Sequence, residues 1–271
     1  MPFVEELHKD GRKLRLMMSP ELVVDKSYGY YSRAEAEGSL VQRHRSGAGP
    51  YVGSMFGKQV AYVDFFHPAA AALWNDGLSA LYAITRFNGL DLHFNVPINL
   101  DNLERGPGTD WQHELPFNPL GEGQRLEQYS LDMDAQNHLP QGANDSSFYE
   151  HFNVHSLYAT KQAERTMASM RSFSEKLPFV TSTGSFSGKG RATAKMLTDS
   201  QMSWEDVSFS IARIFAFQMF GFAMTGENIC SDWYESSQSE LCFRWYQQGA
   251  FAPFAFAWGN GRNTNKEPYE L

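Results

Sequence analysis

The sequence predicts an α/β fold built around a mostly parallel sheet, and three observations support this class. Short apolar runs alternate with longer amphipathic runs along the 271 residues. Hydrophobic residues make up 42% and charged residues 20%, which is an ordinary globular composition and excludes a disordered or collagen-like chain. No internal repeat interrupts the alternation. Because consecutive parallel strands need a crossover, usually a helix, the pattern favours βα units over hairpins.

In the first third of the chain, helix and strand signals alternate with clear boundaries. Gly11 stands where a helix would end, since glycine adopts the left-handed conformation of a helix C-terminus without strain. Pro68 suits the first turn of a helix, where its missing N–H removes no hydrogen bond. The elements expected here are a helix over 4–10, a strand over 14–18, an extended piece over 61–66, a helix over 68–82 and a strand over 89–94.

Residues 96–150 are rich in Gly, Pro, Asn and Asp, and they predict a long inserted loop, a feature that is usually functional or disordered. Helical periodicity returns after it, and Ser203 followed by Glu205 and Asp206 resembles a capping box. The Gly-rich stretch 184–190 lacks the Walker spacing, and we expect no cofactor. The elements expected here are a helix over 157–173, a strand over 178–181, a helix over 203–220, a strand over 223–225, a helix over 236–245 and a strand over 251–258.

Charge and hydropathy exclude several classes of partner. The chain has 23 Lys and Arg against 31 Asp and Glu, a net charge of −8 without any basic cluster. This argues against nucleic acid and against an anionic membrane surface. No stretch approaches the roughly 18 apolar residues of a membrane span. The N-terminus lacks the basic and then apolar pattern of a signal peptide, so a cytoplasmic location is favoured.

The two cysteines, Cys230 and Cys242, form neither a disulfide framework nor a zinc motif, because no CxxC pair or clustered histidine accompanies them. No metal site is expected. Their spacing leaves a local disulfide and two buried thiols equally open. Four histidines in polar or helical context are expected on the surface: His8, His113, His138 and His151.

Several motifs occur in the order found in one enzyme family. The chain resembles glycoside hydrolase family 31, which contains α-glucosidases, maltases and α-xylosidases. The segments that carry this resemblance are F-V-E-E-L-H-K-D-G at 3–11, Y-V-D-F-F-H-P at 62–68, F-N-V-H-S-L-Y at 152–158, P-F-V-T-S-T-G-S-F-S-G-K-G-R at 178–191, W-E-D at 204–206, F-G-F-A-M-T-G-E-N-I-C at 220–230, E-L-C-F-R-W at 240–245 and G-A-F-A-P-F at 249–254.

This resemblance implies a (β/α)8 TIM-type barrel that is incomplete or rearranged, with residues 1–271 forming a single partial barrel domain. The family's first two strands have no counterpart. Two unpaired sheet edges would remain, so self-association or a partner is expected to cover them, unless the sequence derives from a truncated gene model. The family's third to eighth strands map to 14–18, 89–94, 179–183, 196–199, 224–229 and 254–258.

The catalytic positions of the family are mostly changed. A retaining glycosidase needs two carboxylates about 5–5.5 Å apart, one as nucleophile and one as acid/base. In the family motif W-I-D-M-N-E, the nucleophile position is His93 here and the tryptophan position is Asp91. Asp199 matches the acid/base of W-L-G-D-N. The resemblance therefore implies that family-type glucosidase activity is lost.

The positions that bind sugar in the family are also changed, towards apolar and aromatic residues. Such a lining predicts a site for a mostly apolar small molecule, although the same side chains could simply fill the old pocket. The expected ligand-binding residues are Phe56, Phe94, Thr183, Met196, Asn228, Phe256 and Trp258.

Three ionisable residues are the candidate catalytic groups, Asp199, His93 and Asp91. A histidine beside a carboxylate can titrate near neutral pH and act as acid or base, but a His–Asp pair that only holds two loops together is the simpler alternative. The first functional hypothesis is a repurposed, non-hydrolytic enzyme for isomerisation, cyclisation or dehydration. The second is a non-catalytic binding or regulatory partner, and the third a residual α-glucosidase. The family's cysteines at positions 230 and 242 are commonly bridged, which favours a disulfide.

Overall fold

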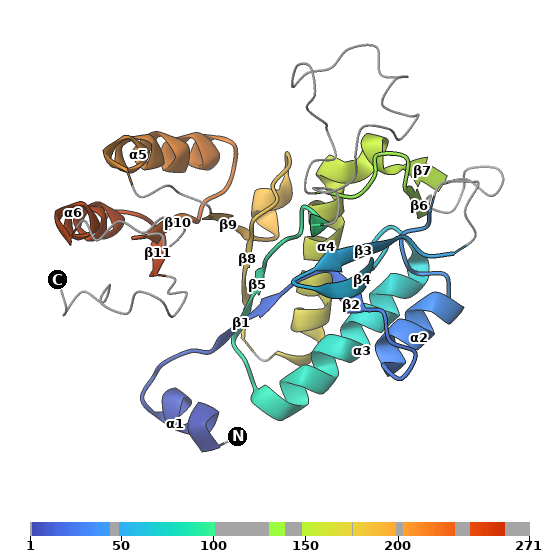
Figure 1. Ribbon diagram of the computed structural model, residues 1–271. Coiled ribbons are helices and arrows are strands. Elements are labelled where there is room, and N and C mark those ends of the chain that lie inside the picture. The colour runs from blue at the N-terminus through green and yellow to red at the C-terminus, as the bar shows by residue number, and fades with distance from the viewer. Residues whose placement is uncertain are drawn as a thin grey trace, which may run out of the picture. The chain divides into compact units, whose positions relative to one another are not determined.

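The computed structural model describes residues 2–43, 49–100, 130–138, 148–174, 176–198, 203–230 and 239–257. The chain divides into two compact units, Met1–Pro178 and Phe179–Leu271, which we describe one at a time (Figure 1). The expectation of one partial barrel domain stays a prediction. Asp199 and Trp258 lie outside the described residues, as do residues 101–129 and 139–147 of the expected loop.

The first unit contains a pair of parallel strands. Helix α1 (Pro2–Lys9) ends before Gly11, which adopts a φ of 78° as predicted for a C-terminal glycine. Strand β1 (Arg15–Met18) pairs in parallel with β5 (Gly89–Leu92), with Arg15 opposite Gly89. Both strands occur where the sequence predicted the family's third and fourth barrel strands.

Two long helices, α3 (Pro68–Thr85) and α4 (His151–Phe173), lie side by side in this unit (Figure 1). The indole N–H of Trp74 donates to Thr166 Oγ1 at 2.9 Å across their contact. Pro68 occupies the first turn of α3, as predicted. Helix α4 begins six residues before the predicted start at 157, because its first turn is mostly polar and apolar periodicity does not reveal it.

Short elements that the sequence analysis did not predict complete the first unit. Strands β2 (Glu21–Val23), β4 (Lys58–Tyr62) and β3 (Val52–Met55) form an antiparallel sheet in that order, and helix α2 (Gly29–Ala36) follows β2. Only part of β4 was expected, since strands this short contain too few residues to show alternation. Phe56 and Gly57, with φ of 49° and 75°, form the turn between β3 and β4.

The polar stretch at 96–150 is not entirely loop. Within it, β6 (Gln136–His138) pairs antiparallel with β7 (Phe148–Glu150). Asp64 ties this pair to the end of β4, because its carboxylate accepts the backbone N–H of His138 at 2.6 Å and the side-chain amide of Asn137 at 3.3 Å. The pair thereby leads the chain into α4.

The second unit contains four parallel strands in the order β8 (Phe179–Ser182), β9 (Ala194–Leu197), β10 (Thr225–Ile229) and β11 (Phe254–Ala257). They correspond to the predicted fifth to eighth barrel strands, although β9 begins two residues before the expected start at 196. A short 3-10 helix, Lys189–Arg191, lies between β8 and β9. In the described part of the chain, β11 pairs only with β10 and is an end strand.

Helices α5 (Trp204–Met219) and α6 (Ser239–Gly249) pack on β10 (Figure 1). Ser203 Oγ accepts the backbone N–H of Asp206 at 3.1 Å, which confirms the predicted start of α5. Every residue of β9 and β10 is buried, as expected for parallel strands covered on both faces. Within the described ranges, no helix has the length and apolar character needed to cross a membrane.

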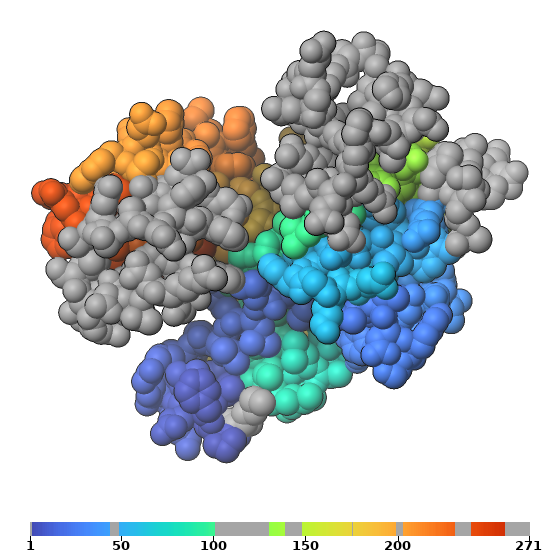
Figure 2. Space-filling model, viewed as in Figure 1, coloured from blue at the N-terminus to red at the C-terminus, as the bar shows by residue number. Residues whose placement is uncertain are grey.

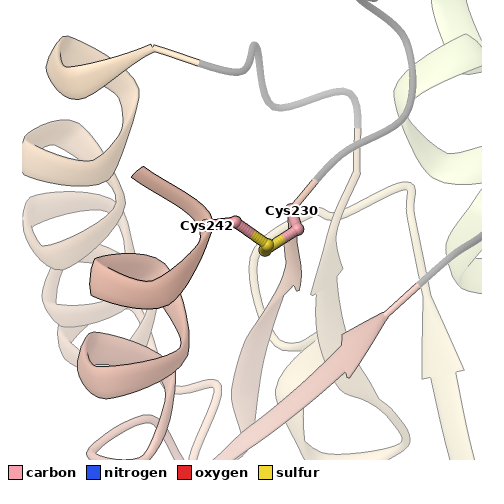
Figure 3. The surroundings of a disulfide bond; sticks show 2 residues. All are labelled: Cys230 and Cys242. Atoms are coloured by element: carbon pink, nitrogen blue, oxygen red, sulfur yellow. A yellow bond between two sulfur atoms is a disulfide. The ribbon is translucent and has the colours of Figure 1, made fainter. Parts of the chain in front are cut away.

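A disulfide joins Cys230, directly after β10, to Cys242 in α6 (Figure 3). This resolves the two alternatives left open by the spacing. The bridge belongs to a buried cluster with Ile229, Leu241 and Trp245. It fixes the C-terminal end of β10, where a barrel places its functional side chains, to the neighbouring helix.

Removing the disulfide should destabilise the second unit. A Cys230→Ser and Cys242→Ser double variant should lose about 2–4 kcal/mol of unfolding free energy, since the bridge closes a loop between cysteines 12 apart in sequence. Urea unfolding with and without dithiothreitol measures the loss. Reductant should lower the urea midpoint of the wild type and leave that of the double variant unchanged. An unchanged wild-type midpoint would contradict a stabilising bridge.

Candidate functional site

His93 directly follows β5, at the position where a barrel strand ends. Its backbone N–H donates to Met18 O at 2.9 Å and to Asp91 O at 3.1 Å, so the main chain at this strand end is fixed to the end of β1. Only 7% of His93 is exposed. The imidazole lies edge-on to the ring of Phe94, with ring centroids 5.5 Å apart. The candidate base is therefore largely buried, with its ring against that of Phe94.

Asp91, grouped with His93 from the sequence, has an ion-pair partner on the adjacent strand. Arg15 Nε donates to Asp91 Oδ1 at 3.0 Å, and Arg15 Nη2 contacts the same oxygen. The two side chains are 27% and 21% exposed, so both charges are partly desolvated. This pairing favours a structural role for Asp91, because its charge is already compensated.

Two predicted ligand-binding aromatics meet beside His93. The rings of Phe56 and Phe94 contact edge-to-face with centroids 6.0 Å apart. Both residues have left-handed backbones, with φ of 49° and 50°. This region costs a residue with a Cβ of order 1 kcal/mol and is enriched at functional positions. The end of β5 thus presents an aromatic pair, with Phe56 mostly exposed.

In the second unit, the strand register brings three predicted ligand residues onto one sheet face. Asn228 lies opposite Phe256 across the β10 and β11 ladder, and Gly226 lies opposite Met196 across β9 and β10. Residues paired in register point to the same side, and so do residues two apart in one strand. We call the side of the sheet that contains Met196, Asn228 and Phe256 the ligand face.

The ligand face is aromatic with one conspicuous polar atom. Phe254 stacks near Phe256, with centroids 6.3 Å apart, and contacts Phe179 edge-on at 5.7 Å. A Cβ at Gly226 would lie 2.3 Å from the backbone oxygen of Phe254 and 2.5 Å from its ring, so only glycine fits at this position. Asn228 Oδ1 is buried and accepts no hydrogen bond from the described residues. A buried acceptor without a donor suits a ligand hydroxyl or N–H.

The opposite side of the same sheet contains charged residues that the sequence analysis did not single out as functional. Lys189 is 1% exposed, and its Nζ donates to Ser182 Oγ at 2.5 Å and to Gly184 O at 2.8 Å. Burial, reinforced by the nearby charge of Lys195, lowers the pKa of Lys189 to about 6. Lys195 Nζ lies 4.9 Å from the ring of Phe217 in α5. With a pKa of about 6, the Lys189 amine would be mostly uncharged at pH 7.

Glu227 also lies on the helix-covered side of β10. It is fully buried, and Trp245 Nε1 of α6 donates to its Oε1 at 3.2 Å. Burial raises the pKa of Glu227, while the hydrogen bonds around it act in the other direction. Successive side chains of a strand point to opposite faces. The sequence could therefore have predicted that Glu227 faces away from Asn228, even in a strand that is buried on both faces.

One histidine was placed wrongly from the sequence. His151, expected on the surface, is fully buried, and its Nδ1 lies 3.0 Å from Asn137 Oδ1. Burial lowers the pKa of His151 to about 3, and burial likewise raises the pKa of Asp64 to about 6. The first turn of α4 is polar, which predicts exposure to solvent, but the β6 and β7 pair covers it.

The structure places the remaining predicted residues as follows. Thr183 follows β8, and its carbonyl accepts a hydrogen bond from Lys195 Nζ. Asp199 and Trp258 are outside the described residues, so their roles stay predictions. Within the described ranges, no three His, Cys, Asp or Glu side chains cluster as metal ligands would.

Comparison with known proteins identifies relatives along the whole chain. A family model described as the glycosyl hydrolases family 31 TIM-barrel domain matches residues 2–271. Intestinal sucrase-isomaltase of Homo sapiens is 28% identical over 275 residues, which cover 99% of this chain and 14% of that protein. Lysosomal alpha-glucosidase of Mus musculus is 28% identical over 272 residues, covering 99% of this chain and 27% of that protein. The chain thus spans a minor part of these relatives.

Solved structures agree on the fold. A glucosidase II alpha subunit with bound Glc1Man2 superposes with a TM-score of 0.77 at 20% identity, covering 99% of this chain and 26% of that one. The family 31 alpha-glucosidase from Bacteroides thetaiotaomicron gives a TM-score of 0.71 at 19% identity, covering 98% of this chain and 37% of that one. At these identities the superpositions establish the shared fold alone.

The ion pair at β5 should be measurable as a coupling energy. Arg15→Met and Asp91→Asn should each destabilise the chain, and the double variant should lose less than their sum by about 1 kcal/mol. Urea unfolding of the four proteins gives the coupling. Additive losses would show that the pair contributes no stability and would return Asp91 to the list of candidate acid/base groups.

The buried lysine should make stability depend on pH above neutrality. Because burial lowers the pKa of Lys189 to about 6 from 10.5, the unfolded chain binds a proton that the folded chain does not between these values. Stability should therefore rise with pH in this window, by up to about 1.4 kcal/mol per pH unit, and fall as pH drops towards 6.

The matched control for this effect is Lys189→Met, which keeps a long unbranched side chain and removes the titrating amine. The difference in unfolding free energy between wild type and variant should increase from pH 7.5 to pH 9.5. A constant difference would mean that Lys189 stays protonated in the folded protein.

Proposed function

Because the chain belongs to glycoside hydrolase family 31, whose barrel fold places active sites at the C-terminal ends of strands, we propose that these ends bind a mostly apolar small molecule here and do not cleave glycosides. The observation that carries the proposal is the ligand face of the second unit, where Asn228 Oδ1 is buried without a hydrogen-bond partner among the described residues and Asn228 lies opposite Phe256, whose ring stacks near that of Phe254. A carbohydrate site would instead offer several carboxylate and guanidinium groups to satisfy the sugar hydroxyls.

The strand-four position supports the non-hydrolytic part of the proposal. A retaining mechanism needs a carboxylate nucleophile that forms a covalent glycosyl-enzyme. His93 stands at that position, and the nearby carboxylate of Asp91 is bound to Arg15. The His93 ring contacts the ring of Phe94, with centroids 5.5 Å apart, so this strand end has an imidazole and an aromatic ring where the retaining mechanism needs a carboxylate.

The chemistry proposed is proton transfer. An imidazole can act as a general acid or base, which makes His93 the candidate of the first unit, and Asp199, which enters only through the resemblance, is the second acid/base candidate. Isomerisation, cyclisation and dehydration can each use a general acid or base. The ligand class that fits the ligand face is a mainly hydrocarbon molecule with one hydroxyl or N–H directed at Asn228.

A non-catalytic binding homologue is the second candidate. Two observations favour it. The Phe254 ring fills the space next to Gly226, and Met196 is only 2% exposed. If the aromatic side chains fill the former pocket, the chain would act through its surface. The experiment below separates the two candidates.

The proposal is tested by pairs of apolar compounds that differ in one hydroxyl group. Asn228→Leu removes the hydrogen-bond acceptor, so it should raise the dissociation constant of the hydroxylated compound by about tenfold. The dissociation constant of the deoxy compound should not change. Titration calorimetry measures both. The same change removes an unsatisfied buried atom, so it should not lower the melting temperature. Gln247→Leu on the exposed side of α6 is the matched control.

Turnover separates an enzyme from a binding protein. Compounds that bind should be converted by the wild type, and His93→Gln and Asp199→Asn should lose conversion while keeping affinity. Binding without conversion would favour the non-catalytic candidate. Hydrolysis of aryl α-glucosides or maltose at any pH would contradict the proposal and support residual glucosidase activity.

A further inference from the structure

Helix α5 presents an apolar surface that the ligand face does not use. Six large apolar side chains on α5 and at its C-terminal end are between 46% and 86% exposed: Trp204, Phe209, Ile211, Phe215, Met219 and Phe220. At 3.6 residues per turn, five of them fall on the half of the helix opposite the buried Ser210 and Ile214, and Ile211 lies at the edge of that half. Figure 2 shows the orange atoms of α5 at the surface of the second unit. We call these six residues the α5 face.

The α5 face is almost free of charge. Helix α5 contains three ionisable side chains, Glu205, Asp206 and Arg213. Arg213 Nη2 lies 3.4 Å from Asp206 Oδ1, and both side chains are on the other half of the helix. Glu205, in the first turn, is the one charged residue of the helix whose position falls within the face. Depletion of charge together with enrichment in aromatic residues and Met is the composition of an interface core.

The size of the α5 face fits a protein interface. From the usual area of such side chains, their exposed parts amount to roughly 800 Å². A stable interface of standard size buries about 800 Å² on each partner. A contiguous apolar patch of this size exceeds what soluble monomers usually expose, which is a few hundred Å². The face is therefore large enough to hold a partner without help from other surfaces.

We propose that the α5 face is the contact between two copies of this chain, related by a two-fold axis. Two chains of net charge −8 repel each other over most of their surfaces. The α5 face is a surface where they can meet without opposing carboxylates. An isologous contact needs a patch that complements itself, and an uncharged apolar helix face does so. A basic protein partner would instead bind the acidic surface outside the α5 face.

The geometry of a single straight helix suits this arrangement. A 16-residue helix is about 24 Å long, and a two-fold axis across its middle packs it antiparallel to its copy. Ile211 and Phe215 are near the middle, so their copies lie close to the axis, with Trp204 and Met219 towards the ends. Ridges of one helix then fit the grooves of the other at an axial separation of about 8–10 Å.

This contact differs from the one that the sequence predicted, which was a partner on an open sheet edge such as that of β11. It is also independent of the proposed ligand, because Asn228 and Phe256 face away from the helix-covered side. If the chain proves to be a monomer, the ligand proposal is unaffected. If no ligand binds, the dimer proposal is unaffected.

Sedimentation velocity and light scattering over a range of concentrations test the proposal. The wild type should be a dimer, and Phe215→Glu or Met219→Glu should raise its dissociation constant by about 30-fold or more, since buried aromatic anchors dominate interfaces. The matched control is Ile84→Glu on α3, which is 59% exposed and outside the face, and it should leave the dimer unchanged. At protein concentrations too low for the dimer to form, both variants should have the same melting curve as the wild type, because both side chains are exposed.

Two results would overturn the proposal. One is a wild type that stays monomeric up to roughly 100 µM, far above the dissociation constants usual for interfaces of this size. In that case, binding of the monomer to neutral lipid vesicles, lost in Phe215→Glu, would identify a membrane surface as the occupant. The other is a wild-type dimer whose dissociation constant does not respond to either glutamate, which would move the contact to another surface.

Discussion

The structure depends on one constraint, which is that parallel strands are buried on both faces and must be covered on each. In the second unit, every residue of β9 and β10 is buried. Helices α5 and α6 cover one side, and the disulfide after β10 fixes α6 there. The strand register then decides which side chains share a face, so a change of one residue in register would exchange Glu227 with Asn228.

This constraint places the buried polar groups of the second unit on one side of the sheet or the other. On the helix-covered side, Lys189 bonds to Ser182 and Gly184, and Glu227 Oε1 accepts from Trp245, while Glu227 Oε2 has no hydrogen-bond partner among the described residues. On the ligand face, Asn228 Oδ1 also has none among the described residues. An unpaired buried acceptor costs free energy comparable to a lost hydrogen bond, and Asn228 differs from Glu227 in lying opposite an aromatic residue, Phe256.

The sequence predicted helix ends correctly where they depend on a few adjacent residues. Pro68 and Ser203 marked the starts of α3 and α5, and Gly11 the end of α1, because capping depends on a few adjacent residues. Burial could not be read in this way. The position of His151 depends on the distant pair β6 and β7, and strands as short as β2 exist only through pairing. At the site, motifs placed His93 and Asn228 at strand ends, but the ion pair of Asp91 with Arg15 required the strand register.

The central claim is that the end of β5 provides no carboxylate nucleophile, and its most direct test is to look for the covalent intermediate. The protein is incubated with an α-glucosyl fluoride activated to accumulate a glycosyl-enzyme, and its intact mass is measured. We expect the mass to remain that of the unmodified chain, with the maltase-type relatives labelled under the same conditions. A stoichiometric glycosyl adduct on the peptide that contains Asp91 and His93 would contradict the account.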